Sequence, residues 1–181
     1  MTDRPPVSAP PGPRLRTDLV DVYVFRRPDG RAPEFLQLRR ARPPMHGTWQ
    51  PVMGHVEPGE SAPHAALREL QEETGLSRTS PALRGFWALE SVHPFYLAGR
   101  DEIVLSPRFA VEVDPAWKPD LTRDPAHPHE PAHDDARWTA SADAFIWPGQ
   151  RACIAEIYAL ILPEVSPVRA VLAIDPATVA R

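Results

Sequence analysis

Residues Gly54–Leu76 read GHVEPGESAPHAALRELQEETGL, and this stretch predicts a helix between two loops. Ser61 is a preferred helix N-cap residue, because its hydroxyl can accept a hydrogen bond from an N–H of the first turn. Pro63 fits that first turn, where a missing N–H costs nothing. The run Ala62–Thr74 consists mostly of strong helix formers, and Gly75 can adopt the left-handed conformation that ends a helix. We therefore expect the helix to span residues 62–74.

Three carboxylates share one face of the predicted helix, because Glu69, Glu72 and Glu73 stand at positions i, i+3 and i+4. Leu67 and Leu70 lie on a different side, which can be buried against a sheet. Carboxylates crowded together repel one another, and a bound cation relieves that repulsion. Oxygen ligands select a hard ion, so the spacing favours Mg²⁺ or Mn²⁺.

The whole stretch resembles the Nudix box, G-x5-E-x7-R-E-U-x-E-E-x-G-U, in which U is an aliphatic residue. An acidic helix face without these flanking positions is usually only solvated surface, and here the flanking positions decide against that interpretation. The resemblance implies a metal-dependent hydrolase that cuts a diphosphate linkage, with Mg²⁺ or Mn²⁺ as its cofactor. The defined positions are all filled, by Gly54, Glu60, Arg68, Glu69, Leu70, Glu72, Glu73, Gly75 and Leu76.

The same resemblance implies roles for individual residues of the box. Arg68 is expected to hold a carboxylate, that of Glu60 or Glu72, in the orientation in which it binds metal. Glu69 and Glu72 are also candidates for the catalytic base, although a glutamate bound to metal is a weak base. The implied metal ligands are the carboxylates of Glu69, Glu72 and Glu73, assisted by the carbonyl of Gly54.

The chain departs from the family pattern at a second acidic position. Many Nudix enzymes carry Glu-His shortly before a Trp, and that Glu serves as base or as an extra ligand. Here Ala132 precedes His133 and Trp138, and Glu130 is displaced by two residues. Glu130 is our first candidate for the base, because a loop can shift its register. His133 and Asp134 are the alternatives, and the loop can equally be polar surface.

Arginines and aromatic residues near the box are candidates for substrate binding. Arg39 and Arg40 precede Gly54, and arginine forks suit phosphate oxygens. They can also be solubilising charges at the end of a strand. Trp49 is a candidate for stacking on a base, although most aromatic residues belong to cores. Other aromatic candidates are Phe86, Trp87 and Trp147.

The remaining pattern predicts an α/β fold. Strand-like segments precede and follow the box, and Gln150–Leu162 has the apolar spacing of a second helix. This order agrees with the Nudix fold, a mixed β-sheet sandwiched between α-helices (α/β/α sandwich). We expect a disordered proline-rich tail over residues 1–14, a Nudix domain over 15–165 and a C-terminal extension over 166–181. The predicted strands are Leu19–Arg26, Glu34–Arg39, Gln50–Met53, Ala82–Val92, Ile103–Val113 and Ala136–Thr139.

Composition narrows the classes of protein. The chain has 181 residues and a formal net charge of −4, so it fits one domain and lacks the basic footprint of a nucleic-acid binder. No apolar run approaches the ~18 residues that span a bilayer, and the first residues lack the apolar segment typical of a signal peptide, so we expect none. The single cysteine, Cys153, excludes an intramolecular disulfide and is expected to be buried. These features favour a cytoplasmic protein with no membrane partner.

Two strings outside the core motif bear on the substrate. Residues 49–60 and 147–151 are similar to the bacterial Nudix branch that hydrolyses dATP or dihydroneopterin triphosphate. That likeness implies a nucleotide-like substrate cut to a monophosphate and pyrophosphate. Other Nudix branches cut ADP-ribose or diadenosine polyphosphates. A nucleotide-sensing module that binds without cleaving is the alternative from another class, and a degenerate box is its usual mark. The oligomeric state is not fixed by the sequence, and a homodimer remains open.

Overall fold

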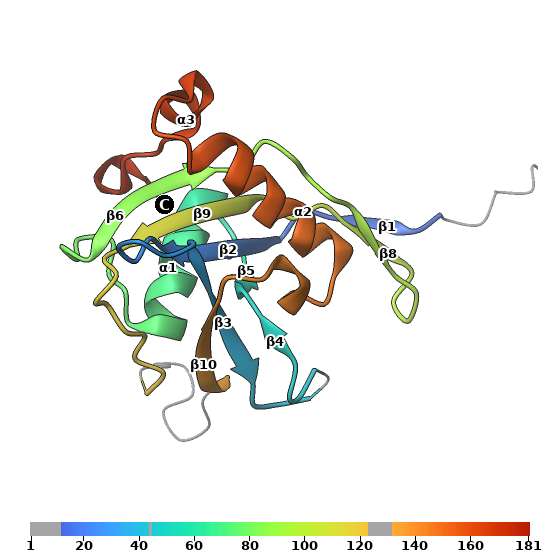
Figure 1. Cartoon of the computed structure of the whole chain (residues 1–181). Helices are drawn as coiled ribbons and strands as arrows, with labels where there is room; N and C mark the ends of the chain where they lie inside the picture. The colour runs from blue at the N-terminus through green and yellow to red at the C-terminus, as the bar shows by residue number, and fades with distance from the viewer. Residues whose placement is uncertain (1–11, 44, 123–131) are drawn as a thin grey trace, which may run out of the picture.

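The structure is a computed structural model and describes residues 12–43, 45–122 and 132–181. Figure 1 shows a central twisted sheet with α1 (Ala62–Thr74) on one face and α2 (Pro148–Glu156) on the other. Both faces of the sheet are therefore covered, as the α/β/α expectation requires.

The main sheet is mixed. Its strand order is β10-β3-β2-β9-β6, with β4 paired to β3 and β5 paired to β2. The pair β2·β9 is parallel and the other pairs are antiparallel. The strands are β2 (Leu19–Arg26), β3 (Glu34–Arg40), β4 (Trp49–Gln50), β5 (Val52–His55), β6 (Leu83–Ala88), β9 (Arg108–Val113) and β10 (His133–Thr139).

Alternation along the central strand β2 builds two cores. Val20, Val22 and Val24 face the layer that holds α1, and Tyr23 and Phe25 face the layer that holds α2. Successive side chains of a strand point to opposite faces, so a strand buried on both sides reads as a continuous apolar run. The α1 side chains that enter this core are Ala65, Ala66, Leu67 and Leu70, joined by Leu76.

Two predicted strands are divided at prolines. Residues 50–53 form parts of β4 and β5 instead of one strand, and Pro51 separates them. Because proline has no N–H to donate, the ladder is interrupted at Pro51. Before it, β4 pairs with β3, and after it, β5 pairs with β2. Residues 103–113 are divided before Pro107 in the same way, and only β9 joins the main sheet.

A second, three-stranded sheet was not predicted. It has the order β1-β8-β7 and extends from the body of the molecule (Figure 1). Its strands are β1 (Arg14–Arg16), β7 (Phe95–Leu97) and β8 (Glu102–Val104). β1 and β7 are too short to show a period-2 pattern, and β8 overlaps the start of the strand predicted over residues 103–113.

The C-terminal third is more divided than expected. The helix predicted over residues 150–162 begins earlier, with Pro148 in its first turn, and its end is a π-helix, η2 (Ile157–Ile161). Two single turns, η1 (Ala142–Ala144) and η3 (Pro176–Thr178), and a short helix α3 (Pro167–Leu172) complete the chain. Of the predicted tail over 1–14, residues 1–11 lie outside the described part. Within the described ranges, no helix is both long enough and apolar enough to cross a bilayer.

A buried ion pair attaches the start of α2 to the sheet. Arg108 Nε lies 3.1 Å from Asp21 Oδ2, and both side chains are almost fully buried. The Arg108 guanidinium also donates to the Gly149 carbonyl at 3.1 Å and contacts the Cys153 sulfur at 3.1 Å. A Cβ at residue 149 would lie 3.3 Å from Arg108 Nη2, so glycine gives the guanidinium room. Cys153 is fully buried, as predicted.

The two ends of α1 differ in how well they were predicted. Gly75 has φ 72° and its N–H donates to the Gln71 carbonyl at 2.9 Å, which confirms the left-handed C-cap. The predicted side-chain cap at Ser61 is wrong. Its hydroxyl makes no capping bond and instead donates to the Ala180 carbonyl at 2.8 Å.

Replacing Gly75 by alanine should destabilise the fold. A Cβ in the left-handed region costs about 1 kcal/mol, so Gly75→Ala should lower the free energy of unfolding in urea by about that amount. Gly99→Ala is the matched control, because nothing lies within 4 Å of its Cβ position and its φ is not in that region. Equal stability of the two variants would contradict the role of Gly75.

Candidate active site

The acidic face of α1 lies against the end of β5. Gly54 of β5 passes so close to Glu69 that a Cβ at residue 54 would lie 1.8 Å from Glu69 Cδ. Any side chain at residue 54 would displace the Glu69 carboxylate from this position. The defined glycine of the box therefore brings the backbone of β5 beside a carboxylate of the helix.

One guanidinium holds three carboxylates of the box. Arg68 donates to Glu60 through Nε at 3.0 Å and Nη2 at 3.1 Å, and its Nη1 donates to Glu69 Oε1 at 2.8 Å and to Glu72 Oε2 at 3.0 Å. Its Nη2 also donates to the His55 carbonyl at 2.6 Å. We expected contact with Glu60 or Glu72, and the structure shows both, together with Glu69.

The pKa values of Glu60 and Glu69 are shifted in opposite directions. Burial raises the pKa of Glu60, but hydrogen bonds from Arg68, the Glu57 N–H and His64 outweigh burial and bring it to about 2. For Glu69, burial raises the pKa, and Arg68 opposes that rise without cancelling it. The charged form of Glu69 therefore carries a desolvation cost that Arg68 offsets only in part.

Glu73 points away from Arg68. It accepts from the Met53 N–H at 3.3 Å, and its Oε1 lies 3.7 Å from His133 Nδ1. Gln50 Nε2 lies 3.0 Å from His133 Nε2, and an amide nitrogen can only donate. His133, which we considered as a base, lies buried between Gln50 and Glu73.

The chemistry of the donor set fits a hard cation. Glu69, Glu72, Glu73 and the Gly54 backbone offer only oxygen, and their carboxylates exceed the charge of Arg68. As they stand, no three His, Cys, Asp or Glu side chains of the described segments gather closely enough to hold a metal.

The other candidate residues are placed around β3 and β10. Glu130 lies outside the described residues. Asp134 is exposed, and its Oδ1 accepts from Arg39 Nε at 2.8 Å. Arg40 stands opposite His133 in the β3·β10 ladder, and no described residue forms an ion pair with it. Of the two arginines proposed for substrate binding, Arg40 is thus the one that forms no ion pair with the described part of the chain.

The aromatic candidates separate clearly by burial. Phe86 and Trp87 lie in the core, 2 % and 5 % exposed, so the idea that they stack on a base is wrong. Trp49 is partly exposed, with the Arg137 guanidinium 4.2 Å and the Arg39 guanidinium 5.8 Å from its ring centroid. A base that stacks on Trp49 would compete with these cations. Trp147 is 52 % exposed.

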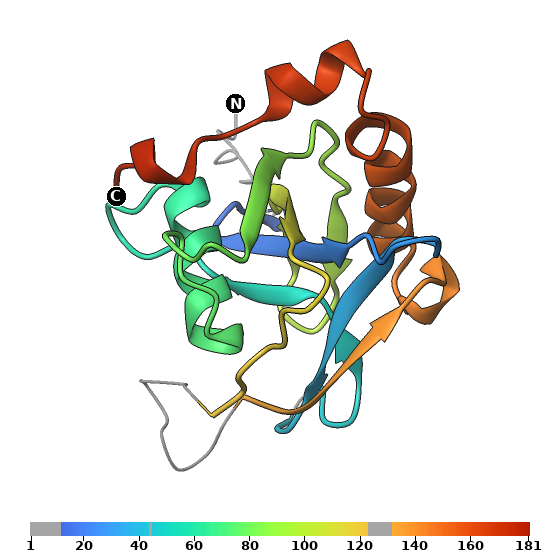
Figure 2. The same ribbon diagram turned by 60° about the vertical axis from the view of Figure 1, so that its left-hand side comes forward.

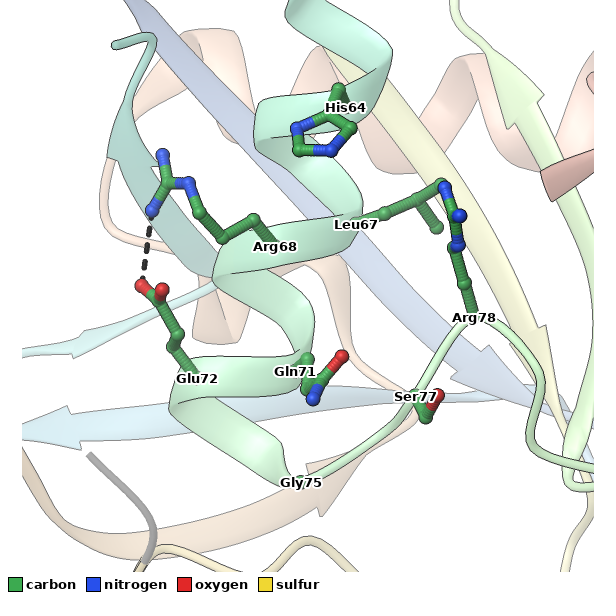
Figure 3. A pocket seen from close by; sticks show the side chains of 8 residues that line it. All are labelled: His64, Leu67, Arg68, Gln71, Glu72, Gly75, Ser77 and Arg78. Atoms are coloured by element: carbon green, nitrogen blue, oxygen red, sulfur yellow. Dashed lines mark hydrogen bonds and ion pairs between the residues drawn. The ribbon is translucent and has the colours of Figure 1, made fainter. Parts of the chain in front are cut away.

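A pocket of about 510 Å³ lies on the outer flank of α1. Figure 3 shows Arg68 and Glu72 at one side of it, with Leu67, Gln71 and His64 facing the loop that carries Ser77 and Arg78. Gly54, Glu69 and Glu73 do not line it. His64 was not predicted to contribute, although it stands four residues after Glu60 and donates to it at 2.6 Å.

Comparison with known proteins gives the family. A family model described as NUDIX domain matches residues 15–161. An octanoyltransferase from Myxococcus xanthus is 34% identical over 143 residues, which is 78% of this chain and 32% of that protein. An asymmetrical bis(5'-nucleosyl)-tetraphosphatase from Caenorhabditis elegans is 42% identical over 57 residues, which is 32% of this chain and 39% of that relative. The chain thus spans between about a third and two fifths of the length of these curated relatives.

Solved structures share the fold. An Ap4A hydrolase from C. elegans has a TM-score of 0.61 at 19% identity and covers 80% of this chain and 96% of its own. The Escherichia coli dihydroneopterin triphosphate pyrophosphohydrolase has a TM-score of 0.60 at 20% identity and covers 80% and 95%. At such identities the likeness establishes the architecture and not the substrate.

Removing Arg68 should make the protein sensitive to acid. The folded-state pKa of Glu60, about 2, lies below its ordinary value of 4.5, so Glu60 adds stability that is complete above pH 4.5 and is lost as pH falls through 2. In Arg68→Gln the main hydrogen bonds that lower the pKa of Glu60 are lost, while the burial that raises it remains, so this pKa should rise. Stability at pH 7 should fall by about 2 kcal/mol, and the acid-unfolding midpoint should move to higher pH.

Arg84→Gln is the matched control, because Arg84 pairs with Asp114 on the surface. Circular dichroism between pH 2 and 7 measures both variants. An unchanged acid midpoint in Arg68→Gln would show that Glu60 does not depend on this arginine.

Proposed function

The chain belongs to the Nudix family, and on this premise we propose that it is a pyrophosphohydrolase that cuts a nucleotide-like substrate with Mg²⁺ or Mn²⁺. The observation that carries the proposal is the complete box, in which Arg68 joins Glu60, Glu69 and Glu72 beside Gly54. A degenerate box would favour a sensing module that does not cleave, and no defined position is degenerate here.

The proposed division of labour follows the contacts. Glu69, Glu72, Glu73 and the Gly54 carbonyl would hold the ion, which when bound neutralises phosphate oxygens and makes water more acidic. Glu60 and Arg68 keep Glu69 and Glu72 in place, as hydrogen-bonded neighbours of metal ligands do. The base is proposed to be Glu130, with Glu69 and Glu72 as alternatives.

For the substrate we propose a (deoxy)nucleoside triphosphate or dihydroneopterin triphosphate, cut to a monophosphate and pyrophosphate. The strings at residues 49–60 and 147–151 support this choice. The local likeness to a tetraphosphatase supports a diadenosine polyphosphate instead, and ADP-ribose is a further Nudix substrate. The octanoyltransferase shares only 32% of its length with this chain, so its name does not extend to it.

Loss of a single ligand carboxylate should abolish turnover. Glu72→Gln and Glu73→Gln each remove a negative charge from the metal-binding face, so hydrolysis should fall at least ~100-fold while the fold persists. Glu164→Gln is the control, because Glu164 is 77% exposed and remote in sequence from the box. EDTA should stop the wild-type reaction, and added Mg²⁺ should restore it.

A panel of triphosphates, dinucleoside polyphosphates and ADP-ribose, with products identified by mass, measures these rates. Pyrophosphate release from triphosphates would support the proposed substrate. Cleavage restricted to dinucleoside polyphosphates would show that these are the substrate instead. Full rates in both glutamine variants would refute the ligand assignment.

Arg40 and Arg39 should differ in their effect on substrate binding. Arg40→Gln removes a cation that no described residue pairs, so KM should rise about tenfold with little change in kcat. Arg39→Gln should have a smaller effect, because Asp134 already pairs with that guanidinium. A larger rise in KM for Arg39→Gln would reverse the assignment.

A further inference from the structure

The last nine residues cross from the open edge of the sheet to the start of the catalytic helix. We name Ala173–Arg181 the strap. It begins on the edge strand β6, where Ala173 bridges Trp87 and the Ile174 N–H donates to the Phe86 carbonyl at 2.8 Å. Figure 2 shows this end of the chain beside the first turn of α1. The strap therefore runs from the edge strand β6 to the loops beside α1.

The far end of the strap contacts both loops that flank α1. The Ala180 carbonyl accepts from the Ser61 hydroxyl at 2.8 Å, and Arg181 donates to Glu57 at 3.3 Å. On the other side of the helix, Arg78 donates to the Val179 carbonyl at 3.2 Å. The strap thus contacts the loop before α1 and the loop after it.

The Ser61 hydroxyl bonds to the strap instead of capping α1. Serine at an N-cap normally accepts from the first-turn N–H groups, and Ser61 has the extended backbone of such a residue, with φ −81° and ψ 152°. Its hydroxyl nevertheless donates to Ala180. The hydroxyl of this serine is therefore bonded to the strap, while its carbonyl accepts the first helical hydrogen bond, from the Ala65 N–H at 2.9 Å.

The loop that the strap contacts also carries Glu60. The Glu57 N–H donates to Glu60 Oε2 at 2.9 Å, and Glu60 accepts two bonds from Arg68, which in turn holds Glu69 and Glu72. We infer that the strap is a positioning element of the active site, which keeps the Glu57–Ser61 loop closed so that Glu60 can hold Arg68 against the metal-binding carboxylates. The part of this inference that concerns metal rests on the proposed function.

The strap is held mainly by two apolar side chains. Ile174 and Val179 are partly buried against the core that contains α1. The pair Arg181–Glu57 is 70% and 51% exposed, and exposed pairs contribute little. A pocket of about 400 Å³ remains between the strap and β6, lined by Leu83 and Phe86 among others. A segment with few buried contacts can open without global unfolding.

Hydrogen exchange and metal binding test the inference on the full chain. Val179→Ser removes one apolar anchor, and Val171→Ser on α3 is the matched control, because Val171 is 82% exposed. In Val179→Ser we expect amide exchange to accelerate about tenfold in residues 55–61 as well as in 173–181, and Mn²⁺ affinity to fall several-fold. The control should change neither. Exchange that accelerates in 173–181 alone, with unchanged Mn²⁺ affinity, would overturn the inference.

A second variant guards against general destabilisation. Ser61→Ala combined with Arg181→Ala removes the two polar contacts between the strap and the Glu57–Ser61 loop without changing a core side chain, and it should still accelerate exchange in residues 55–61. Protection there equal to wild type would overturn the inference. Wild-type protein that binds no Mn²⁺ and cuts no substrate would refute the proposed function, and the exchange measurements would still decide the role of the strap.

Discussion

The site depends on one positive charge among several negative ones. Glu60 is almost fully buried and Glu69 largely so, and carboxylates removed from water are costly unless something pairs with them. Arg68 pairs with three carboxylates, those of Glu60, Glu69 and Glu72, because its planar guanidinium donates hydrogen bonds in several fixed directions. The raised pKa of Glu69 shows that this cost is not fully offset. This excess of negative charge over the single guanidinium is the physical argument for the divalent cation that we propose here.

Packing on the opposite side of the helix sets this arrangement. Leu67 and Leu70 are buried against the sheet, which fixes the height of α1 above β5. β5 is in turn fixed by its ladder with β2, in which Gly54 stands opposite Val20. The close approach of Gly54 to Glu69 follows from these apolar contacts. Hydrophobic burial thus determines the geometry, and the charged residues operate within it.

Much of this could be predicted from local chemistry. The limits of α1, its apolar side and the left-handed Gly75 follow from spacing and propensity, and the structure has each of them. The contacts of Arg68 were predicted only in part. The sequence shows which carboxylates lie within one helical turn of Arg68, but it does not show how many of them one guanidinium can contact. The roles of the box residues as ligands stay predictions.

The failures have a common cause, which is tertiary structure. Ser61 has the type and position of a cap, and a segment more than a hundred residues away takes its hydroxyl. Pro51 and Pro107 divide runs that look continuous, because each new strand finds another neighbour. Cys153 shows what the same burial does elsewhere: surrounded by the sheet and α2, its thiol has a pKa raised by desolvation, although Arg108 is adjacent. The chain's single thiol is therefore shielded from oxidants and alkylating agents for as long as α2 stays on the sheet, so its accessibility follows the integrity of that layer.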